Sequence, residues 1–209
     1  MLSYPDSRQV EGGTLTENRI KKAALTLFAT NGYDGASLAQ IAEAVGIKKQ
    51  SIATYFRKKE DLFVAVFEDM AQDYIGFIKE MHDEMHLETV EKKLQYILYQ
   101  GYQYKVKNPD QTAFYKRAIH FPPSFLETTI RHEIMKMEQQ TSKLYREVFE
   151  KGIREGVIKN QEIENLLAAF YCLIDGISMQ MFFYDRDEFN KRLSSIWKIF
   201  WDGIKNEEG

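Results

Sequence analysis

Apolar residues recur every three to four positions along almost the whole chain, which is the spacing that lines one face of an α-helix. The segment "ENRIKKAALTLFATNG" shows the pattern, with one face made of Ile20, Ala23, Ala24, Leu27 and Phe28. No segment alternates apolar and polar residues with period two, and there is no internal repeat. Only 4 prolines interrupt the 209 residues. The sequence therefore predicts an all-α fold.

Helix start and stop signals divide this pattern into about nine helices. Thr16 is a suitable N-cap for the first helix, and Gly32 is a suitable stop. Ser37 opens the second helix, because Gln40 three positions later completes a capping box, and Gly46 ends it. The remaining helices are expected at about residues 48–57, 59–84, 88–108, 110–121, 124–155, 161–184 and 187–205.

Positive charge is concentrated in one short segment of an acidic protein. The chain has a formal net charge of −3, yet "GIKKQSIATYFRKKEDL", residues 46–62, contains five cations and only two acids. Such a local cluster, rather than the total charge, indicates a surface that binds nucleic acid.

Two short helices that meet at a glycine are the components of a helix-turn-helix. Ala42 is small enough for the helices to approach closely, and Gly46 can adopt the left-handed conformation that reverses the chain. With Ile41, Ile47 and Ile52 buried between the helices, the outward face consists of Lys48, Lys49, Gln50, Ser51, Thr54 and Tyr55.

The outward face suits the major groove of DNA. Lysine and glutamine hydrogen-bond base edges, while serine, threonine and tyrosine reach bases or phosphates. Lys59 begins the next helix, where free N–H groups and the helix dipole favour a phosphate. The alternative is an ordinary pair of helices with a solvated basic face. The charge pattern favours DNA binding over this alternative.

Residues 16–62, "TENRIKKAALTLFATNGYDGASLAQIAEAVGIKKQSIATYFRKKEDL", resemble the N-terminal domain of TetR-type transcriptional regulators. The elements in register are Ala23-Ala24, Leu27-Phe28, Gly32-Tyr33, Ser37-Leu38, Ile41-Ala42, Gly46-Ile47, Ile52, Tyr55-Phe56, Lys59 and Leu62. The resemblance implies a homodimer with a helix-turn-helix DNA-binding domain at residues 16–62. Residues 63–209 would be a helical effector-binding and dimerisation domain, and residues 1–15 a flexible arm.

The resemblance also assigns roles on the DNA. Bases would face Lys49, Gln50, Ala53 and Thr54, and phosphates would face Ser37, Tyr55 and Lys59. The family usually has a tyrosine where this chain has Ala53, so one long polar contact is missing. A methyl group there can instead meet a thymine methyl. Ala53 therefore weakens the transfer of any known operator preference to this chain.

The segment after residue 87 is rich in aromatic residues and methionine. The resemblance implies an effector pocket in this region, and these side chains suit a bulky apolar or aromatic small molecule. The expected lining residues are Tyr99, Tyr102, Phe114, Tyr115, His120, Phe121, Phe149 and Met181, with "FYKRAIHFPP" as the pocket edge. His120 could hydrogen-bond a ligand or cap its own helix. Packing in the core is the alternative for each residue.

The last two long helices are expected to pair with their copies across a two-fold axis, as a four-helix interface. The candidate interface residues are Phe170, Leu173, Ile177, Ile196, Phe200 and Ile204, although the same positions could face the pocket. Cys172, the only cysteine, is expected to be a packed small apolar residue in a reducing cytoplasm.

The sequence does not match the motifs expected for catalysis, metal binding or membrane insertion. "HDEMH" places His82 and His86 one helical turn apart, but Glu84 stands in the wrong position for a zinc protease. No Walker loop, Gly-x-Ser-x-Gly or Gly-x-Gly-x-x-Gly occurs. Asp175 interrupts the apolar run at residues 166–184, which argues against a membrane span. We expect no catalysis, no cofactor and no metal.

These inferences together predict a cytoplasmic, dimeric, ligand-responsive transcriptional repressor that binds a near-palindromic operator on double-stranded DNA. A small apolar or aromatic effector would release it. One alternative is an activator or a ligand-independent regulator of the same fold. An alternative of a different class is a helical-bundle protein or enzyme that binds a small molecule.

Overall fold

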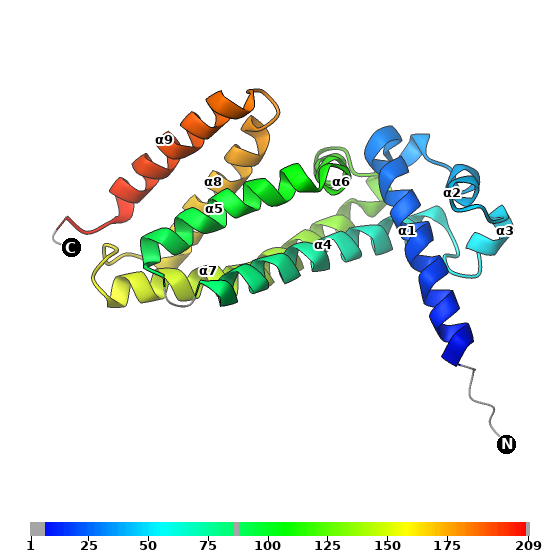
Figure 1. Ribbon diagram of the computed structural model, residues 1–209, viewed down its shortest axis with the longest axis horizontal. Coiled ribbons are helices and arrows are strands. Elements are labelled where there is room, and N and C mark those ends of the chain that lie inside the picture. The colour runs from blue at the N-terminus through cyan, green and yellow to red at the C-terminus, as the bar shows by residue number, and fades with distance from the viewer. Residues whose placement is uncertain (1–6, 86–87, 208–209) are drawn as a thin grey trace, which may run out of the picture. The chain divides into compact units, whose positions relative to one another are not determined.

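The computed structural model describes residues 7–85 and 88–207, with side chains from residue 14 onward. This part of the chain forms nine α-helices and one 3-10 helix (Figure 1). The α-helices are α1 (Ser7–Gly35), α2 (Leu38–Val45), α3 (Lys49–Ile52), α4 (Lys59–Glu84), α5 (Val90–Lys107), α6 (Pro109–His120), α7 (Glu127–Arg154), α8 (Ile163–Gln180) and α9 (Arg186–Ile204); the 3-10 helix, η1, is Ser124–Leu126. The predicted all-α fold with about nine helices is confirmed.

The first helix differs from its prediction at one end. It begins at Ser7 and not at Thr16, so the expected start was wrong. Gly12 and Gly13 each lower helix propensity by about 1 kcal/mol relative to alanine, but the backbone remains helical through them. The predicted stop is where the helix breaks, because Gly32 has φ 72° and ψ −179°.

The described residues fold into two compact units. The first contains the chain up to Asp73 together with Asn108–Met135, and the second contains Tyr74–Lys107 and the chain from Lys136 onward. Helices α4 and α7 each contribute residues to both units. Helix α6 belongs to the unit that also contains α1, α2 and α3.

The first unit is built around aromatic side chains. Phe63 makes edge-to-face contacts with Phe28 and Phe114, with ring centroids 5.0 Å apart in both pairs. Phe114 comes from α6, where Ala118 is buried beside it against the same core. Such aromatic pairs add about 0.5–1.5 kcal/mol to the gain from burial. This core therefore joins α6 firmly to α1 and α4 within the unit.

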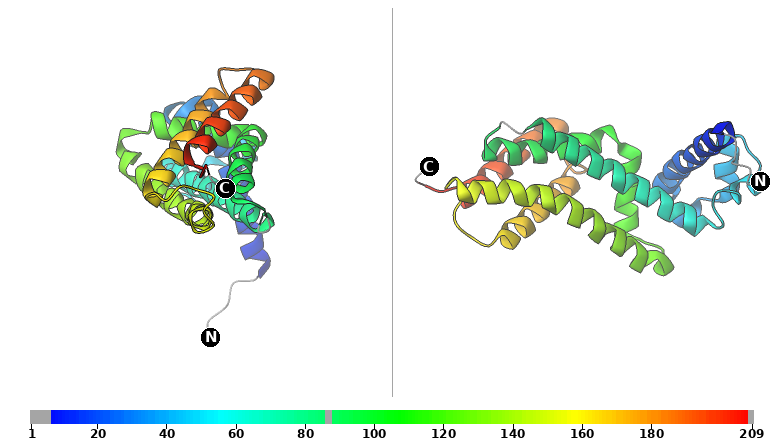
Figure 2. Two further views of the ribbon diagram at one scale, coloured as in Figure 1. Left: turned by 90° about the vertical axis from the view of Figure 1, so that its left-hand side faces the viewer. Right: turned by 90° about the horizontal axis from the view of Figure 1, so that it is seen from below.

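The second unit packs helices α5, α7, α8 and α9 around a core of its own (Figures 1 and 2). Phe170 of α8 contacts Tyr145 and Phe149 of α7 edge to face, and all three rings are buried. The end of α9 is tied to the loop after α7, where the Lys159 N–H donates to the Ile204 carbonyl at 2.9 Å. These contacts hold α9 against the rest of the unit.

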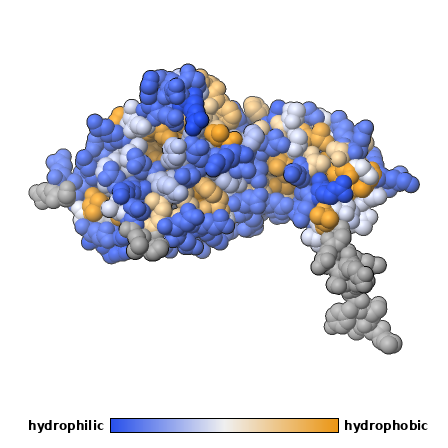
Figure 3. Space-filling view, viewed as in Figure 1, coloured by the Kyte–Doolittle hydropathy of each residue, from blue (hydrophilic) through white to orange (hydrophobic). Residues whose placement is uncertain are grey.

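Hydrophilic residues cover most of the face shown in Figure 3, with smaller apolar patches between them. In the described ranges, the helices all fall short of the length and apolarity that a membrane crossing requires.

The turn between α2 and α3 offers a test of the fold. Gly46 has φ 76° and ψ 32°, and a Cβ at this position would meet no atom within 4 Å. We expect Gly46→Ala to lower the free energy of unfolding by about 1 kcal/mol, because a left-handed conformation is unfavourable for alanine. Gly76→Ala, inside α4 and equally unhindered, should raise it by about 0.5–1 kcal/mol. Urea denaturation measures the free energy of unfolding of both variants. If both substitutions raised it, or both lowered it, the left-handed backbone at Gly46 would not explain the effect.

Candidate functional site

Side-chain and backbone caps hold α2 at both ends. The Ser37 N–H donates to Gln40 Oε1 at 2.9 Å, and the Gln40 N–H donates to Ser37 Oγ at 3.2 Å, which confirms the predicted capping box. At the other end, the Gly46 N–H bonds back into the helix, and Arg19 Nη2 donates to the Val45 carbonyl at 2.7 Å. The orientation of α2 is therefore well determined by its neighbours.

The following helix is shorter than predicted. Helix α3 spans only Lys49–Ile52, not residues 48–57, and tight turns continue from it to Phe56. Lys48 stands at its N-cap without a side-chain cap hydrogen bond. A helix of four residues has little stability of its own. Its position comes instead from Ile52 and Phe56, which are buried in the core of the first unit.

The outward face of α3 and its turn carries the predicted DNA-contacting side chains. Ser51 and Tyr55 are half-buried, and the exposed residues are Lys48, Lys49, Gln50, Ala53 and Thr54. Arg57 and Lys58 lie in the same basic segment and are both exposed, although neither was predicted to contact DNA. We call this set, from Lys48 to Lys58, the basic surface. It offers flexible ammonium groups and one amide to an anionic polymer such as DNA.

Lys59 is placed differently from its neighbour Lys58. Its Nζ donates to the carbonyls of Tyr33 at 2.8 Å and Ala36 at 3.0 Å. It also lies 4.0 Å from the centroid of the Tyr33 ring. The ammonium group thus stabilises the end of α1, and the phosphate contact that the resemblance implied stays a prediction. Burial, together with the carboxylate of Glu60, raises the pKa of Tyr33 to about 12.

A second cation that the sequence analysis missed stabilises the same helix. Arg117 of α6 donates from Nε to the Ala29 carbonyl at 2.8 Å and from Nη2 to the Thr30 carbonyl at 3.0 Å. These carbonyls lie just before the break at Gly32, so they lack partners further along the helix. No local sequence signal marks Arg117, because its partners lie more than 80 residues earlier in the chain.

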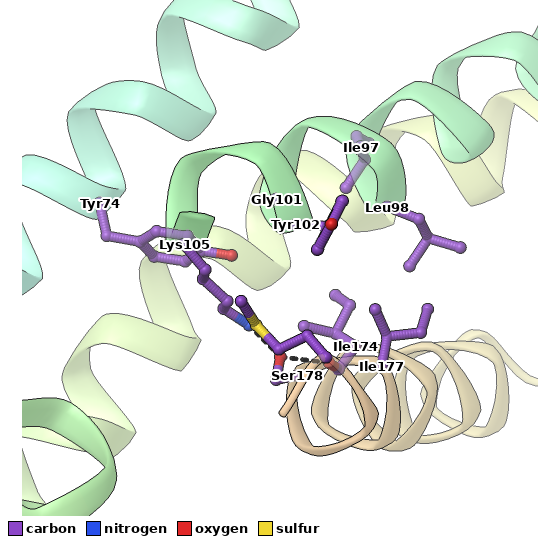
Figure 4. Close-up of a pocket in the computed structure, with 10 residues that line it drawn as sticks. Tyr74, Ile97, Leu98, Gly101, Tyr102, Lys105, Ile174, Ile177 and Ser178 are labelled. Atoms are coloured by element: carbon purple, nitrogen blue, oxygen red, sulfur yellow. Dashed lines mark hydrogen bonds between the residues drawn. The ribbon is translucent and has the colours of Figure 1, made fainter. Parts of the chain in front are cut away.

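The second unit contains a small cavity between α4, α5 and α8 (Figure 4). Its volume is about 10 Å³, which is room for about one water molecule. The lining residues are Tyr74, Ile97, Leu98, Gly101, Tyr102, Lys105, Ile174, Ile177, Ser178 and Met181. A ligand larger than water would have to displace some of these side chains.

One cation and several hydroxyl groups make this cavity partly polar. Lys105 Nζ donates to Ser178 Oγ, which itself donates to the Ile174 carbonyl at 2.6 Å (Figure 4). Burial lowers the pKa of Lys105 to about 8, although the Asp175 carboxylate acts in the opposite direction. Burial likewise raises the pKa of Tyr74 to about 12, and its hydroxyl is hydrogen-bonded to that of Tyr145.

Only some of the predicted ligand-binding residues line this cavity. Tyr102 and Met181 do. Tyr99 is 43% exposed and lines a separate open groove beside Trp197 of α9. Phe149 is fully buried in the core, with its ring centroid 5.6 Å from that of Phe170, so the core alternative applies to it.

The predicted pocket edge on α6 lies in the first unit and not with this cavity. Phe114 is fully buried in the core, and Tyr115 stacks on Phe67 with ring centroids 6.2 Å apart. His120 and Phe121 are exposed, and the Phe121 N–H, rather than the imidazole, caps the helix. The apolar face of α6 therefore packs against α1, and a ligand contact of these residues stays a prediction.

The residues predicted for the dimer interface face the core of their own chain. Phe170, Ile177 and Ile204 are buried there, while the half-buried residues packed against it include Leu173, Ile196 and Phe200. The exposed face of α8 instead carries Ala169, Cys172, Gly176 and Met179, and Ile199 of α9 is 75% exposed. Cys172 is therefore exposed, contrary to the expectation of a packed residue.

Of the two histidines in "HDEMH", only His82 lies in the described part of the chain. His82 Nε2 lies 3.5 Å from Glu147 Oε2, and His86 falls outside the described residues. Among the side chains that the structure describes, no group of three or more His, Cys, Asp or Glu is placed to hold a metal ion.

Comparison with protein families identifies the class of the protein. Residues 20–66 match the family model "Bacterial regulatory proteins, tetR family". Residues 88–205, more than half of the chain, match the model "Tetracyclin repressor-like, C-terminal domain". The chain belongs to the TetR family of transcriptional regulators.

Curated relatives resemble only part of the chain. The biofilm operon regulator IcaR of Staphylococcus epidermidis is 34% identical over 68 residues, which is 32% of this chain and 37% of that protein. The regulator RutR of Escherichia coli is 34% identical over 65 residues, which is 31% of each. The chain thus spans about a third of the length of these relatives.

Solved structures share the fold over nearly the whole chain. The regulator FadR from Bacillus subtilis, in complex with stearoyl-CoA, has a TM-score of 0.74 at 20% identity, covering 90% of this chain and 98% of that one. A transcriptional regulator from Saccharomonospora viridis, in complex with choline, has a TM-score of 0.73 at 18% identity, covering 93% and 100%.

The contrast between two adjacent lysines gives a test of the site. We expect Lys59→Met to lower the free energy of unfolding by about 1–3 kcal/mol, because two backbone carbonyls lose a charged donor. Lys58→Met should change it by less than about 0.5 kcal/mol, since this side chain is exposed. Urea denaturation measures both values. Equal losses in the two variants would show that Lys59 does not brace α1.

Proposed function

We propose that this regulator is a cytoplasmic, homodimeric repressor that binds a near-palindromic operator and is released by a small effector. The observation that carries the proposal is the exposed basic surface on α3, held in place by the caps of α2 and by the buried Ile52 and Phe56. The family membership supports the same reading.

On the operator, α3 would lie in the major groove. Base edges would face Lys49, Gln50, Ala53 and Thr54. Phosphates would face Ser37, Lys48, Ser51 and Tyr55, with Arg57 and Lys58 adding charge nearby. The N-terminus of α4 can still offer backbone N–H groups to a phosphate, although the Lys59 side chain is directed to α1.

Two such surfaces are needed for a near-palindromic site. Dimeric helix-turn-helix proteins place their reading helices about 34 Å apart, one turn of the DNA helix. The exposed face of α8 and α9, defined by Ala169, Cys172, Gly176, Met179 and Ile199, suits a two-fold interface. Its small residues allow helices to approach closely, while Met179 and Ile199 offer apolar area.

The effector would bind in the cavity lined by Tyr102 and Met181. Because this cavity has room for only about one water molecule, effector binding would favour a different conformation with a larger cavity. Helix α4 would connect the enlargement of the cavity to a movement of the DNA-binding surface. It follows α3 directly in the chain, and it also supplies Tyr74 to the cavity wall. The bound molecules of the relatives, stearoyl-CoA and choline, differ too much in size and charge to assign an effector.

Selection on random DNA duplexes at about 0.15 M salt tests the proposal, because counterions suppress non-specific binding at this ionic strength. Protein refolded after removal of small molecules serves as the input. An enriched inverted repeat supports a dimeric DNA reader. Failure to enrich any sequence contradicts the proposal.

The reading helix is tested by changing its two central side chains. Lys49→Ala combined with Gln50→Ala should weaken binding to the selected repeat by about a thousandfold or more, because each lost base contact costs about 1–3 kcal/mol in each of the two half-sites. The preference among variant repeats should also decrease. Fluorescence anisotropy measures both effects. The control pair Lys79→Ala and Glu80→Ala, exposed on α4, should leave both unchanged.

The interface is tested by placing a charge on its exposed apolar face. Ile199→Glu should convert the dimer to a monomer without loss of helix content, since the side chain is 75% exposed in one subunit. The matched control is Val106→Glu on α5, where the side chain is 48% exposed and does not belong to the residues that define the proposed face. Sedimentation equilibrium gives the masses. A dimer that survives Ile199→Glu would place the interface elsewhere.

A further inference from the structure

The cavity in the second unit contains one feature that an apolar effector alone does not explain. Most of its wall is aliphatic or aromatic, but Lys105 directs its ammonium group to Ser178 at one side (Figure 4). The Lys105 side chain is half-buried, and removing an ammonium group from water is costly. A cation retained beside an apolar cavity therefore calls for a functional explanation.

We propose that the effector has an anionic head, such as a carboxylate, which binds to Lys105 Nζ, and an apolar body. The inference rests on the proposed function, because it takes this cavity to be the effector site. It narrows the expected class from apolar or aromatic molecules to amphipathic anions. The body would lie against Ile97, Tyr102 and Ile177, which line the cavity beyond the cation.

The geometry at Lys105 suits an anion better than a neutral group. An ammonium group can donate to three acceptors at once, so a ligand oxygen can join Ser178 Oγ or replace it. Ser178 Oγ already donates to the Ile174 carbonyl, so it presents an acceptor to Lys105 and holds the ammonium group at the cavity wall. Hydrogen bonds to a charged partner are about twice as strong as neutral ones.

The same geometry disfavours a cationic effector. A quaternary ammonium head would meet Lys105 as a like charge in a largely apolar site, where the repulsion is weakly screened. The choline seen in one relative therefore does not suggest the effector of this chain.

The cavity must also enlarge to admit the apolar body. Met181 lines it at the end of α8, and methionine is unbranched and changes shape easily. The residues that follow, Phe182 and Phe183, are 48% and 69% exposed. Movement of Met181 is thus the simplest way to open space beside Lys105.

The charge state of Lys105 gives the site a dependence on pH. With a pKa of about 8, the ammonium form dominates at pH 7 and is lost as the pH rises above 8. Asp175 on α8 favours the charged form, and Tyr74 on α4, with its pKa of about 12, stays neutral in this range. Tyr102 on α5 also faces the cavity. Burial raises the pKa of Tyr171 on α8, so this hydroxyl does not add a negative charge near neutral pH. Anion binding should therefore be strongest well below pH 8 and weaken as the pH rises through 8.

The test uses the full-length protein and matched probes. Straight-chain carboxylates from hexanoate to dodecanoate are titrated by calorimetry, alongside the primary alcohols and the alkyltrimethylammonium salts of the same chain lengths. We expect a carboxylate to bind at least about tenfold more tightly than its alcohol, which corresponds to about 1.4 kcal/mol, and the ammonium salts not to bind. Lys105→Met should remove this advantage and leave the alcohol affinity within about twofold.

Lys107→Met is the matched control, because Lys107 is an exposed lysine on the same helix and does not line the cavity. It should retain the carboxylate preference. If Lys105→Met fails to fold, the wild-type protein still decides the question, since carboxylate affinity should decrease between pH 7.5 and about 9.5 while alcohol affinity stays constant.

Several results would overturn the proposal: equal affinity for carboxylates and alcohols, carboxylate binding that Lys105→Met does not change, or no binding by any carboxylate in the series. DNA binding to the selected repeat is measured separately on the same samples. Loss of the anion effect with intact DNA binding contradicts this inference alone, whereas absence of DNA binding contradicts the proposed function.

Discussion

The carbonyl groups at the ends of helices in the first unit need partners that their own helices cannot supply. Arg19 bonds the last carbonyl of α2, Lys59 bonds two carbonyls at the end of α1, and Arg117 bonds two carbonyls just before Gly32. Each cation comes from a different helix, so these bonds fix α1, α2, α4 and α6 against one another. Helix α3 has only four residues and depends on this frame for its orientation.

The basic residues of the first unit therefore have two separate roles, one structural and one on the exposed surface. Arg19, Lys59 and Arg117 stabilise helix ends, whereas Lys48 and Lys49 remain exposed and can meet an anionic partner. Charge counting along the sequence cannot separate these roles. Lys58 and Lys59 are adjacent, yet one is exposed and the other lies on two carbonyls, because successive residues point in different directions at the start of α4.

Local signals predicted most helix boundaries, because caps and left-handed glycines act over a few residues. The Ser37 capping box, the turn at Gly46 and the break at Gly32 all belong to this group. Predictions that depended on tertiary contacts were less successful. Phe114 has the same helical spacing whether α6 borders a ligand cavity or packs on α1, and only the fold distinguishes the two.

The faces of α8 show a second limit of sequence patterns. This helix is apolar around most of its circumference, so periodicity does not say which side enters the core. Phe170 packs in the core, while Cys172, two positions later, is exposed. Large rings fill the interior of one chain, and small residues are left on the outside. The residues predicted for the interface therefore lie on the faces of α8 and α9 that pack in the core of their own chain.

Positive charge is used in two different environments in this protein, with different physical consequences. The lysines of the basic surface are exposed, so salt screens their charges over about 8–10 Å. Lys105 is screened less because it is largely surrounded by protein, and its charge depends on pH because burial lowers its pKa to about 8. Under the proposals above, both environments bind anions, one the phosphates of DNA and the other the head of an effector. Ionic strength would then control the first interaction most strongly and pH the second, so the two can be varied separately even though both rely on lysine.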